Sequence, residues 1–279
     1  MRSTFWLALL ALAPMAAIAS DDNCKFRADR TGGTDAKGVE KVIIRAGAGD
    51  LKVTGRSNAA RIEAHGVACA GKQEMLDASQ ISVRREGNVV YVETTLPQND
   101  DSWSWGKNDY AGIDLDVALP SGVPVDAIDS SGDATLEDLH SLVMQDSSGD
   151  LTLARIAGAI EVTDSSGDLR IRNAGSVRLR DSSGDIEIDA VTADVVVQMD
   201  SSGDMEINHV DGSVVIEQDS SGSIRVENVK GNVDVKSDSS GDIYAARVTG
   251  NFTVSEDSSG SIDHDGIGGR VTIPDNKQD

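Results

Sequence analysis

Apolar and polar residues alternate in short runs through the second half of the chain, and these runs recur at fixed distances. In one such unit the apolar positions are Met205, Ile207, Val210, Val214 and Ile216. A period of two in mostly β-branched residues indicates strands with one buried face. Each unit therefore predicts two short strands that are separated by turn residues rather than by a helix.

The units share the sequence Asp-Ser-Ser-Gly, and successive copies begin 17 to 19 residues apart. The copies begin at Asp129, Asp146, Asp164, Asp181, Asp200, Asp219, Asp238 and Asp257. This period is too short for a repeat that contains a full helix. It is typical of a β-solenoid, in which equivalent strands of successive coils pair in parallel about 4.8 Å apart. We expect an all-β fold: a single-stranded parallel β-solenoid of about 8–10 short coils with an N-terminal β cap.

The first half of the chain contains weaker versions of the same pattern. The segment from Gly47 to Val53 resembles a repeat without its serines, Ile81 to Leu96 reads as a hairpin around Gly87, and Ile113 to Leu119 reads as a strand. These strands would cover the first open edge of the solenoid. The expected division is 1–19 signal peptide, 20–41 N-terminal segment, 42–126 degenerate coils, hairpin and an aromatic loop (99–112), 127–274 eight-unit solenoid and 275–279 tail.

Residues 1–19 have the features of a secretory signal. Arg2 supplies the positive charge, an apolar run extends from Phe5 to Ala13, and Ala17 to Ala19 form a small-residue cleavage motif. The apolar run is too short to span a bilayer, and no later stretch is long and apolar enough to anchor the chain. We expect an exported protein, periplasmic or secreted, with no membrane insertion of the mature chain.

Export makes the two cysteines informative. Cys24 and Cys69 are the only pair in the chain, and an oxidising compartment favours a disulfide between them. Two free or separately buried thiols are the alternative.

The amino-acid composition indicates which kind of core and which class of partner to expect. Aromatic residues make up 3% of the chain, so the core should be a narrow column of aliphatic side chains. Acidic residues outnumber basic residues by 47 to 25, which gives a net charge of -22. This charge repels phosphates and excludes both nucleic-acid binding and charge-driven docking on anionic lipid.

The repeats and the two segments directly before them resemble a known family. The strand from Ile113 to Val117 is followed by Leu119-Pro120-Ser121-Gly122-Val123, and then by units of the form S-S-G-D-[LI]-x-[LI]. This arrangement resembles the bacterial putative-adhesin family of secreted β-strand repeats, domains of unknown function related to the auto-transporter adhesin head. The resemblance covers roughly Val42 to Ile273. It implies a secreted β-repeat scaffold with an adhesin-like role, and it supplies no catalytic residue.

The repeats place carboxylates in two ladders along the solenoid. One ladder consists of the first Asp of each repeat. The other follows the repeat glycine and consists of Asp133, Asp150, Asp168, Asp185, Asp204 and Asp242, with Ser223 and Ser261 in two places. Carboxylates about 5 Å apart repel each other by about 1 kcal/mol even in water. We expect wet ladders in which hydrogen bonds to the turn backbone, solvent and counter-ions offset this repulsion.

Calcium is the alternative way to offset the repulsion, because Ca²⁺ prefers several carboxylate and carbonyl oxygens. The candidate ligands are Asp146, Asp164, Asp181, Asp200, Asp219 and Asp238. The nine-residue glycine-rich repeat of calcium-binding β-helices is not present in this sequence.

The segment from Asn99 to Tyr110 breaks the regular pattern. It contains Trp103, Trp105 and Tyr110 among polar and acidic residues. Aromatic side chains on a loop of a rigid scaffold are candidates for partner binding. The alternative is that the two tryptophans cover the N-terminal end of the solenoid.

These observations favour a non-enzymatic, exported β-solenoid that acts as an adhesin-like structural or interaction module of the bacterial envelope. Catalytic residues and cofactors are not expected. The partner would be an envelope protein or a glycan, and the protein would be monomeric. Two alternatives stay open: a carbohydrate-active β-helix enzyme, and a calcium-dependent binding module on the same fold.

Overall fold

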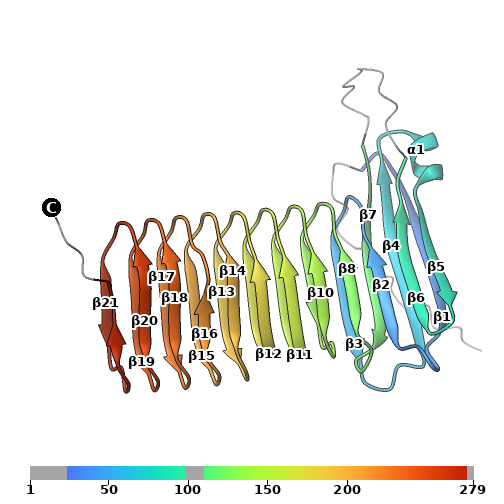
Figure 1. Cartoon of the computed structure of the whole chain (residues 1–279). Helices are drawn as coiled ribbons and strands as arrows, with labels where there is room; N and C mark the ends of the chain where they lie inside the picture. The colour runs from blue at the N-terminus through green and yellow to red at the C-terminus, as the bar shows by residue number, and fades with distance from the viewer. Residues whose placement is uncertain (1–23, 98–109, 275–279) are drawn as a thin grey trace, which may run out of the picture.

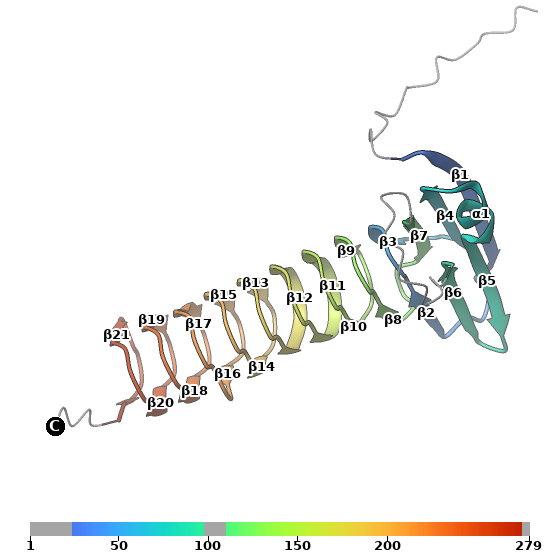
Figure 2. The same ribbon diagram turned by 90° about the horizontal axis from the view of Figure 1, so that it is seen from above.

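The computed structural model describes residues 24–97 and 110–274. Within this part, the chain forms a rod with a wider cap at its N-terminal end (Figure 1). Each coil of the rod contributes one strand to each of two long faces, which form two rows in Figure 2. The predicted all-β parallel solenoid with an N-terminal β cap is confirmed.

The first face begins in the cap and runs to the last coil. In spatial order its strands are β1 (Phe26–Asp35), β4 (Arg61–Ala70), β7 (Ala111–Pro120), β3 (Leu51–Arg56), β9 (Ala134–Glu137), β11 (Leu151–Thr163), β12 (Leu169–Arg180), β13 (Ile186–Val191), β15 (Met205–Val210), β17 (Ile224–Val229), β19 (Ile243–Val248) and β21 (Ile262–Asp265). Pairing on this face is antiparallel from β1 through β4 to β7 and parallel from β7 onwards.

The second face begins with the predicted hairpin. Its strands are β5 (Gln80–Glu86), β6 (Val89–Thr95), β2 (Lys41–Arg45), β8 (Val125–Ile128), β10 (Leu142–Gln145), the second halves of β11 and β12, β14 (Val195–Met199), β16 (Val214–Ile216), β18 (Val233–Asp238), β20 (Phe252–Asp257) and β22 (Val271–Thr272). Within the described residues, only β5 and β6 pair in antiparallel fashion on this face. Both faces therefore start in the cap and continue without a break into the solenoid.

The core lies between the two faces and is a column of aliphatic side chains. Ile207 pairs in register with Val226 of the next coil, and both are buried. Val233 on the second face is also buried, so the predicted strand phase is confirmed on both faces. Phe252 is an exception to the narrow aliphatic column. It lies near the C-terminal end, where its ring meets His264 edge-on with the centroids 6.2 Å apart.

The cap includes a short helix that the alternation did not predict, α1 (Gln73–Ala78). Met75 and Leu76 on this helix bury their side chains in a small second core under the helix. Arg30 of β1 provides hydrogen bonds to backbone carbonyls at the C-terminal end of this helix. Its Nε donates to the carbonyl of Ser79 and its Nη2 donates to that of Leu76, each at 2.8 Å.

The predicted disulfide between Cys24 and Cys69 is present. It joins the residues before β1 to the end of β4, so it closes the cap at the edge of the first face. None of the helices in the described part of the chain has the length and apolar character that a membrane span requires.

Candidate functional site

In seven of the eight Asp-Ser-Ser-Gly repeats, the first Asp is buried inside the solenoid. Asp181 follows the buried Leu179 and the exposed Arg180, so the period of two in strand β12 continues for one more inward position. We call the side chains at this position the inner column. The inner column consists of Asp129, Asp146, Asp164, Asp181, Asp200, Asp219 and Asp238, each between 0% and 3% exposed. The expectation of a wet ladder is therefore wrong for these seven carboxyl groups.

Within the described residues, every carboxyl group of the inner column has at least one oxygen without a hydrogen bond, and in Asp129, Asp200 and Asp238 both oxygens lack one. The Oδ1 atoms of Asp164, Asp181 and Asp219 accept the backbone N–H of the next serine at 2.6, 2.8 and 2.9 Å. Their Oδ2 atoms are buried and have no hydrogen-bond partner among the described residues. Such an oxygen is costly when the group is ionised, because it has lost water and gained nothing in its place.

Burial shifts the titration of the inner column upward. It is the main cause that raises the pKa of Asp164 and of Asp219 to about 7, and the neighbouring carboxylates of the column add to the effect. The same two causes raise the pKa of Asp129 to about 7. Burial also raises the pKa of Asp181 and Asp200 to about 6.

The second ladder lies on the surface and has a different environment. Asp150, Asp168 and Asp185 each accept, on Oδ1, the backbone N–H of the equivalent residue one coil further on, at 3.1, 3.1 and 2.9 Å. We call this ladder, which starts at Asp133 and ends at Asp242, the outer ladder. At its end, hydrogen bonds from Ser261 hold the pKa of Asp242 below its usual value. Protein hydrogen bonds thus offset the repulsion here, but they run between coils rather than within one turn.

The serines complete the stacked turn. Ser183, Ser221 and Ser240 donate their hydroxyl groups to serine carbonyls of the preceding coil at 3.1 to 3.2 Å.

The described residues bring together no group of three or more acidic, histidine or cysteine side chains that could hold a metal ion. The six candidate calcium ligands of the alternative reading all belong to the inner column, and calcium binding there stays an untested alternative.

Only part of the predicted aromatic site falls within the described residues. Trp103 and Trp105 lie outside them. Tyr110 lies directly before β7, and its hydroxyl accepts the backbone N–H of Lys25 at 3.0 Å. Tyr110 therefore belongs to the end of the cap that carries the disulfide and α1.

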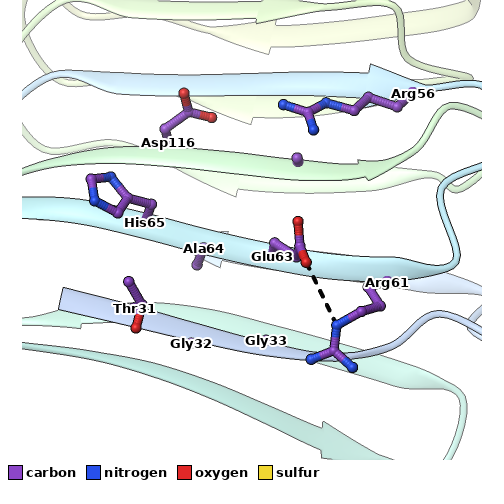
Figure 3. A pocket seen from close by; sticks show the side chains of 10 residues that line it. Thr31, Gly32, Gly33, Arg56, Arg61, Glu63, Ala64, His65 and Asp116 are labelled. Atoms are coloured by element: carbon purple, nitrogen blue, oxygen red, sulfur yellow. Dashed lines mark ion pairs between the residues drawn. The ribbon is translucent and has the colours of Figure 1, made fainter. Parts of the chain in front are cut away.

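A groove that sequence reasoning missed crosses the outer surface of the cap (Figure 3). It has a volume of about 620 Å³ and lies over β1, β4 and β7, with the end of β3 at its rim. We call it the cap groove. The side chains that define it are Thr31, Arg56, Arg61, Glu63, His65 and Asp116, together with Gly33.

The alternation of β4 explains why the cap groove is polar. Arg61, Glu63 and His65 occupy consecutive outward positions, while the residues between them are buried. On the neighbouring strand Gly33 lies opposite Glu63 in the pairing register and has no side chain to fill the space. The outward positions of two paired strands thus create a hollow rather than a ridge.

The charges of the cap groove balance. Arg61 Nε lies 3.6 Å from Glu63 Oε1, and His65 Nε2 lies 3.8 Å from Asp29 Oδ1. Arg56 is exposed and forms no ion pair within the described residues. Its guanidinium is therefore available to a ligand.

A second hollow of about 550 Å³ adjoins the cap groove, because Arg56 lines both. The second hollow lies at the start of the solenoid and includes His140 and an ion pair in which Arg155 Nε is 2.7 Å from Asp138 Oδ1. This contact holds the pKa of Asp138 below its usual value. The polar surface thus continues from the cap onto the first coils.

One family model matches most of the chain. The sequence profile of the family described as Toastrack DUF4097 matches residues 34–266. None of the curated proteins matches the chain.

Several solved structures are similar at low sequence identity. A putative adhesin from Bacteroides fragilis is 13% identical, with 88% of this chain and 97% of that chain covered and a TM-score of 0.40. A putative lipid binding protein from Parabacteroides distasonis is 12% identical, with 88% and 97% covered and a TM-score of 0.35. A putative cell adhesion protein from Clostridium sporogenes is 12% identical, with 89% and 99% covered and a TM-score of 0.28.

The profile match extends from β1 to the last coil and includes all eight repeats. The resemblance carried by the strand before Pro120 and by the repeats is confirmed by this match. The chain belongs to the Toastrack DUF4097 family.

Proposed function

We propose that this protein is an exported, non-enzymatic interaction module that binds a glycan of the bacterial envelope in its cap groove. The solenoid then acts as a rigid, acidic spacer behind the binding site. The disulfide between Cys24 and Cys69 supports export, because such bonds persist in oxidising compartments.

The observation that carries the proposal is the lining of the cap groove. Two guanidinium groups (Arg56 and Arg61) and two carboxylates (Glu63 and Asp116) line it, together with His65. Among the described residues, the only other side chains at its surface are those of Thr31 and two alanines. Protein partners usually require an apolar centre surrounded by a polar rim, and this groove offers none. Sugar hydroxyl groups, in contrast, can donate to carboxylates and accept from guanidinium groups.

The overall charge of the protein favours a neutral ligand. The chain carries a net charge of -22, and this field repels an acidic polymer. Within the groove itself the two positive and two negative groups cancel. A neutral glycan therefore meets local hydrogen-bonding groups without an electrostatic barrier.

The test is a glycan array followed by calorimetry with the mature protein. We expect Arg56→Ala to weaken binding about tenfold or more, because it removes a charged hydrogen-bond donor to the ligand. Arg178→Ala is the matched control, since Arg178 is an exposed arginine of β12 without an ion pair in the described residues. Equal binding by both variants, or binding to an envelope protein and to no glycan, would contradict the proposal.

A further inference from the structure

The inner column joins one buried carboxyl group to the next along the solenoid. Asp200 and Asp219 are bridge partners in adjacent coils, and so are Asp219 and Asp238. Parallel strands lie about 4.8 Å apart, so the carboxyl oxygens of neighbouring coils are within reach of each other. The column is therefore continuous rather than a set of separate sites.

No positive charge balances the column. Within the described residues, none of its seven members forms an ion pair with Lys, Arg or His. The charged groups that raise their pKa values are other aspartates: neighbouring members of the column, Asp257 beyond its end, Asp50 in the cap, and Asp133 and Asp185 of the outer ladder. Seven ionised carboxylates cannot remain buried together in such surroundings, because burial and like charge both favour the neutral form.

The hydrogen bonds of the column indicate what is missing. In Asp164, Asp181 and Asp219 one oxygen already accepts a backbone N–H, and the other is buried without a partner among the described residues. A carboxylate can only accept hydrogen bonds, whereas a protonated carboxyl group also donates one. A proton on one aspartic acid thus satisfies two buried oxygens, its own and one of the neighbouring coil.

We propose that the inner column is a proton-binding site, in which carboxyl groups of successive coils are linked by shared O–H···O hydrogen bonds. Each proton is taken up from solvent during folding, neutralises one carboxylate and is released when the solenoid unfolds. About one proton per neighbouring pair, or about three for seven members, is the smallest uptake that leaves no two adjacent groups ionised together. The inference is independent of the glycan proposed for the cap groove.

The raised pKa values of the column support this site and define its working range. They reach about 7 for Asp129, Asp164 and Asp219, and about 6 for Asp181 and Asp200. The column therefore holds its protons in a mildly acidic medium and loses them as the medium becomes neutral or alkaline. An exported protein meets such changes directly.

Infrared spectroscopy of the folded mature protein tests the site. At about pH 5.5, exposed Asp and Glu are almost entirely ionised, so a protonated-carboxyl C=O band reports mainly groups with raised pKa values. We expect this band at about pH 5.5 and its loss at about pH 8.5. The triple substitution Asp181→Asn, Asp200→Asn and Asp219→Asn should remove a corresponding part of it, because asparagine is the neutral isostere.

The matched control is the same substitution in the outer ladder: Asp150→Asn, Asp168→Asn and Asp204→Asn. These carboxylates are exposed and accept backbone N–H groups, so the band should be unchanged. Absence of the band in the wild-type protein at about pH 5.5, or an equal loss in the two triple variants, would overturn the proposal. So would calcium bound stoichiometrically to the wild-type protein without such a band, because the column would then hold a metal ion. The wild-type measurements decide the matter even if an inner variant does not fold.

Discussion

Substitution of the glycine in a repeat turn tests how closely the coils are stacked. Gly203 has a φ of 130°, in a region that residues with a side chain rarely adopt. A Cβ atom at this position would lie 1.9 Å from the carbonyl oxygen of Gly184 in the preceding coil. The glycine is therefore required both by its own backbone and by its neighbour. We expect Gly203→Ala to be strongly destabilising.

The size of the effect follows from these two contributions. The left-handed backbone costs a residue with a side chain about 1–2 kcal/mol. Relief of the contact requires the coils to separate locally, which lengthens the hydrogen bonds from Gly184 N to Ser202 O (3.1 Å) and from Ile186 N to Asp204 O (2.9 Å). Each such bond is worth about 1 kcal/mol. The expected loss is therefore about 3–4 kcal/mol.

Two other glycines separate the contributions. Gly87→Ala should cost about 1 kcal/mol, because Gly87 has a φ of 60° but a Cβ atom added there would meet no other atom within 4 Å. Gly122→Ala should be nearly neutral, because Gly122 has neither a left-handed φ nor a close neighbour. Urea denaturation followed by circular dichroism measures all three. If Gly203→Ala cost no more than Gly87→Ala, the close contact between the coils would be refuted.

Two further predictions concern the core and the cap. Ile207→Asp should lower stability by several kcal/mol, because it buries an unpaired charge in a fully buried position; an unchanged melting temperature would mean that this side chain points outward. Replacing Cys24 and Cys69 with serine should destabilise the cap by about 4 kcal/mol in the chain-entropy model for a loop of this length. Hydrogen exchange should then increase in β1 and β4, and equal protection of these strands in both proteins would count against the prediction.

Much of the fold was readable from the repeats. The alternation that contains Ile207 and the fixed return of Asp-Ser-Ser-Gly predicted parallel coils, because both patterns are local and are repeated many times. The hairpin around Gly87 was equally local. Helix α1 was not predicted, because six residues are too few to establish a helical period, and its stability depends on Arg30 and on packing in the cap.

The candidate sites were harder to predict for two different reasons. The signal for the inner column was present, since Leu179 and Asp181 follow the period of two, but an aspartate at an inward position is unexpected without a cationic partner. The cap groove left no local signal. Its residues come from β1, β4 and β7, which antiparallel pairing brings together, and from β3, which pairs with β7 in parallel.

The central claim is that seven successive coils of the solenoid each bury a carboxyl group, and the pH dependence of unfolding tests it most directly. Burial raises the pKa of Asp219 from 3.8 to about 7, so between these pH values the folded state holds a proton that the unfolded state has lost. For this group alone the shift corresponds to at most about 4 kcal/mol of stability, present at low pH and lost as the pH rises through the folded pKa.

Some exposed carboxylates have the opposite effect, but in another range. Arg155 lowers the pKa of Asp138, and Arg170 lowers that of Glu187. Their contribution is present above their unfolded pKa values and is lost as the pH falls below about 4, so it leaves the range between pH 5 and pH 8 unaffected.

The measurement is therefore the free energy of unfolding of the wild-type protein in urea between about pH 5 and pH 8. A buried, proton-holding column predicts that stability falls by several kcal/mol across this range, with the steepest change near the pKa values of about 6 to 7. A stability that stays constant or increases from pH 5 to pH 8 would contradict the buried column.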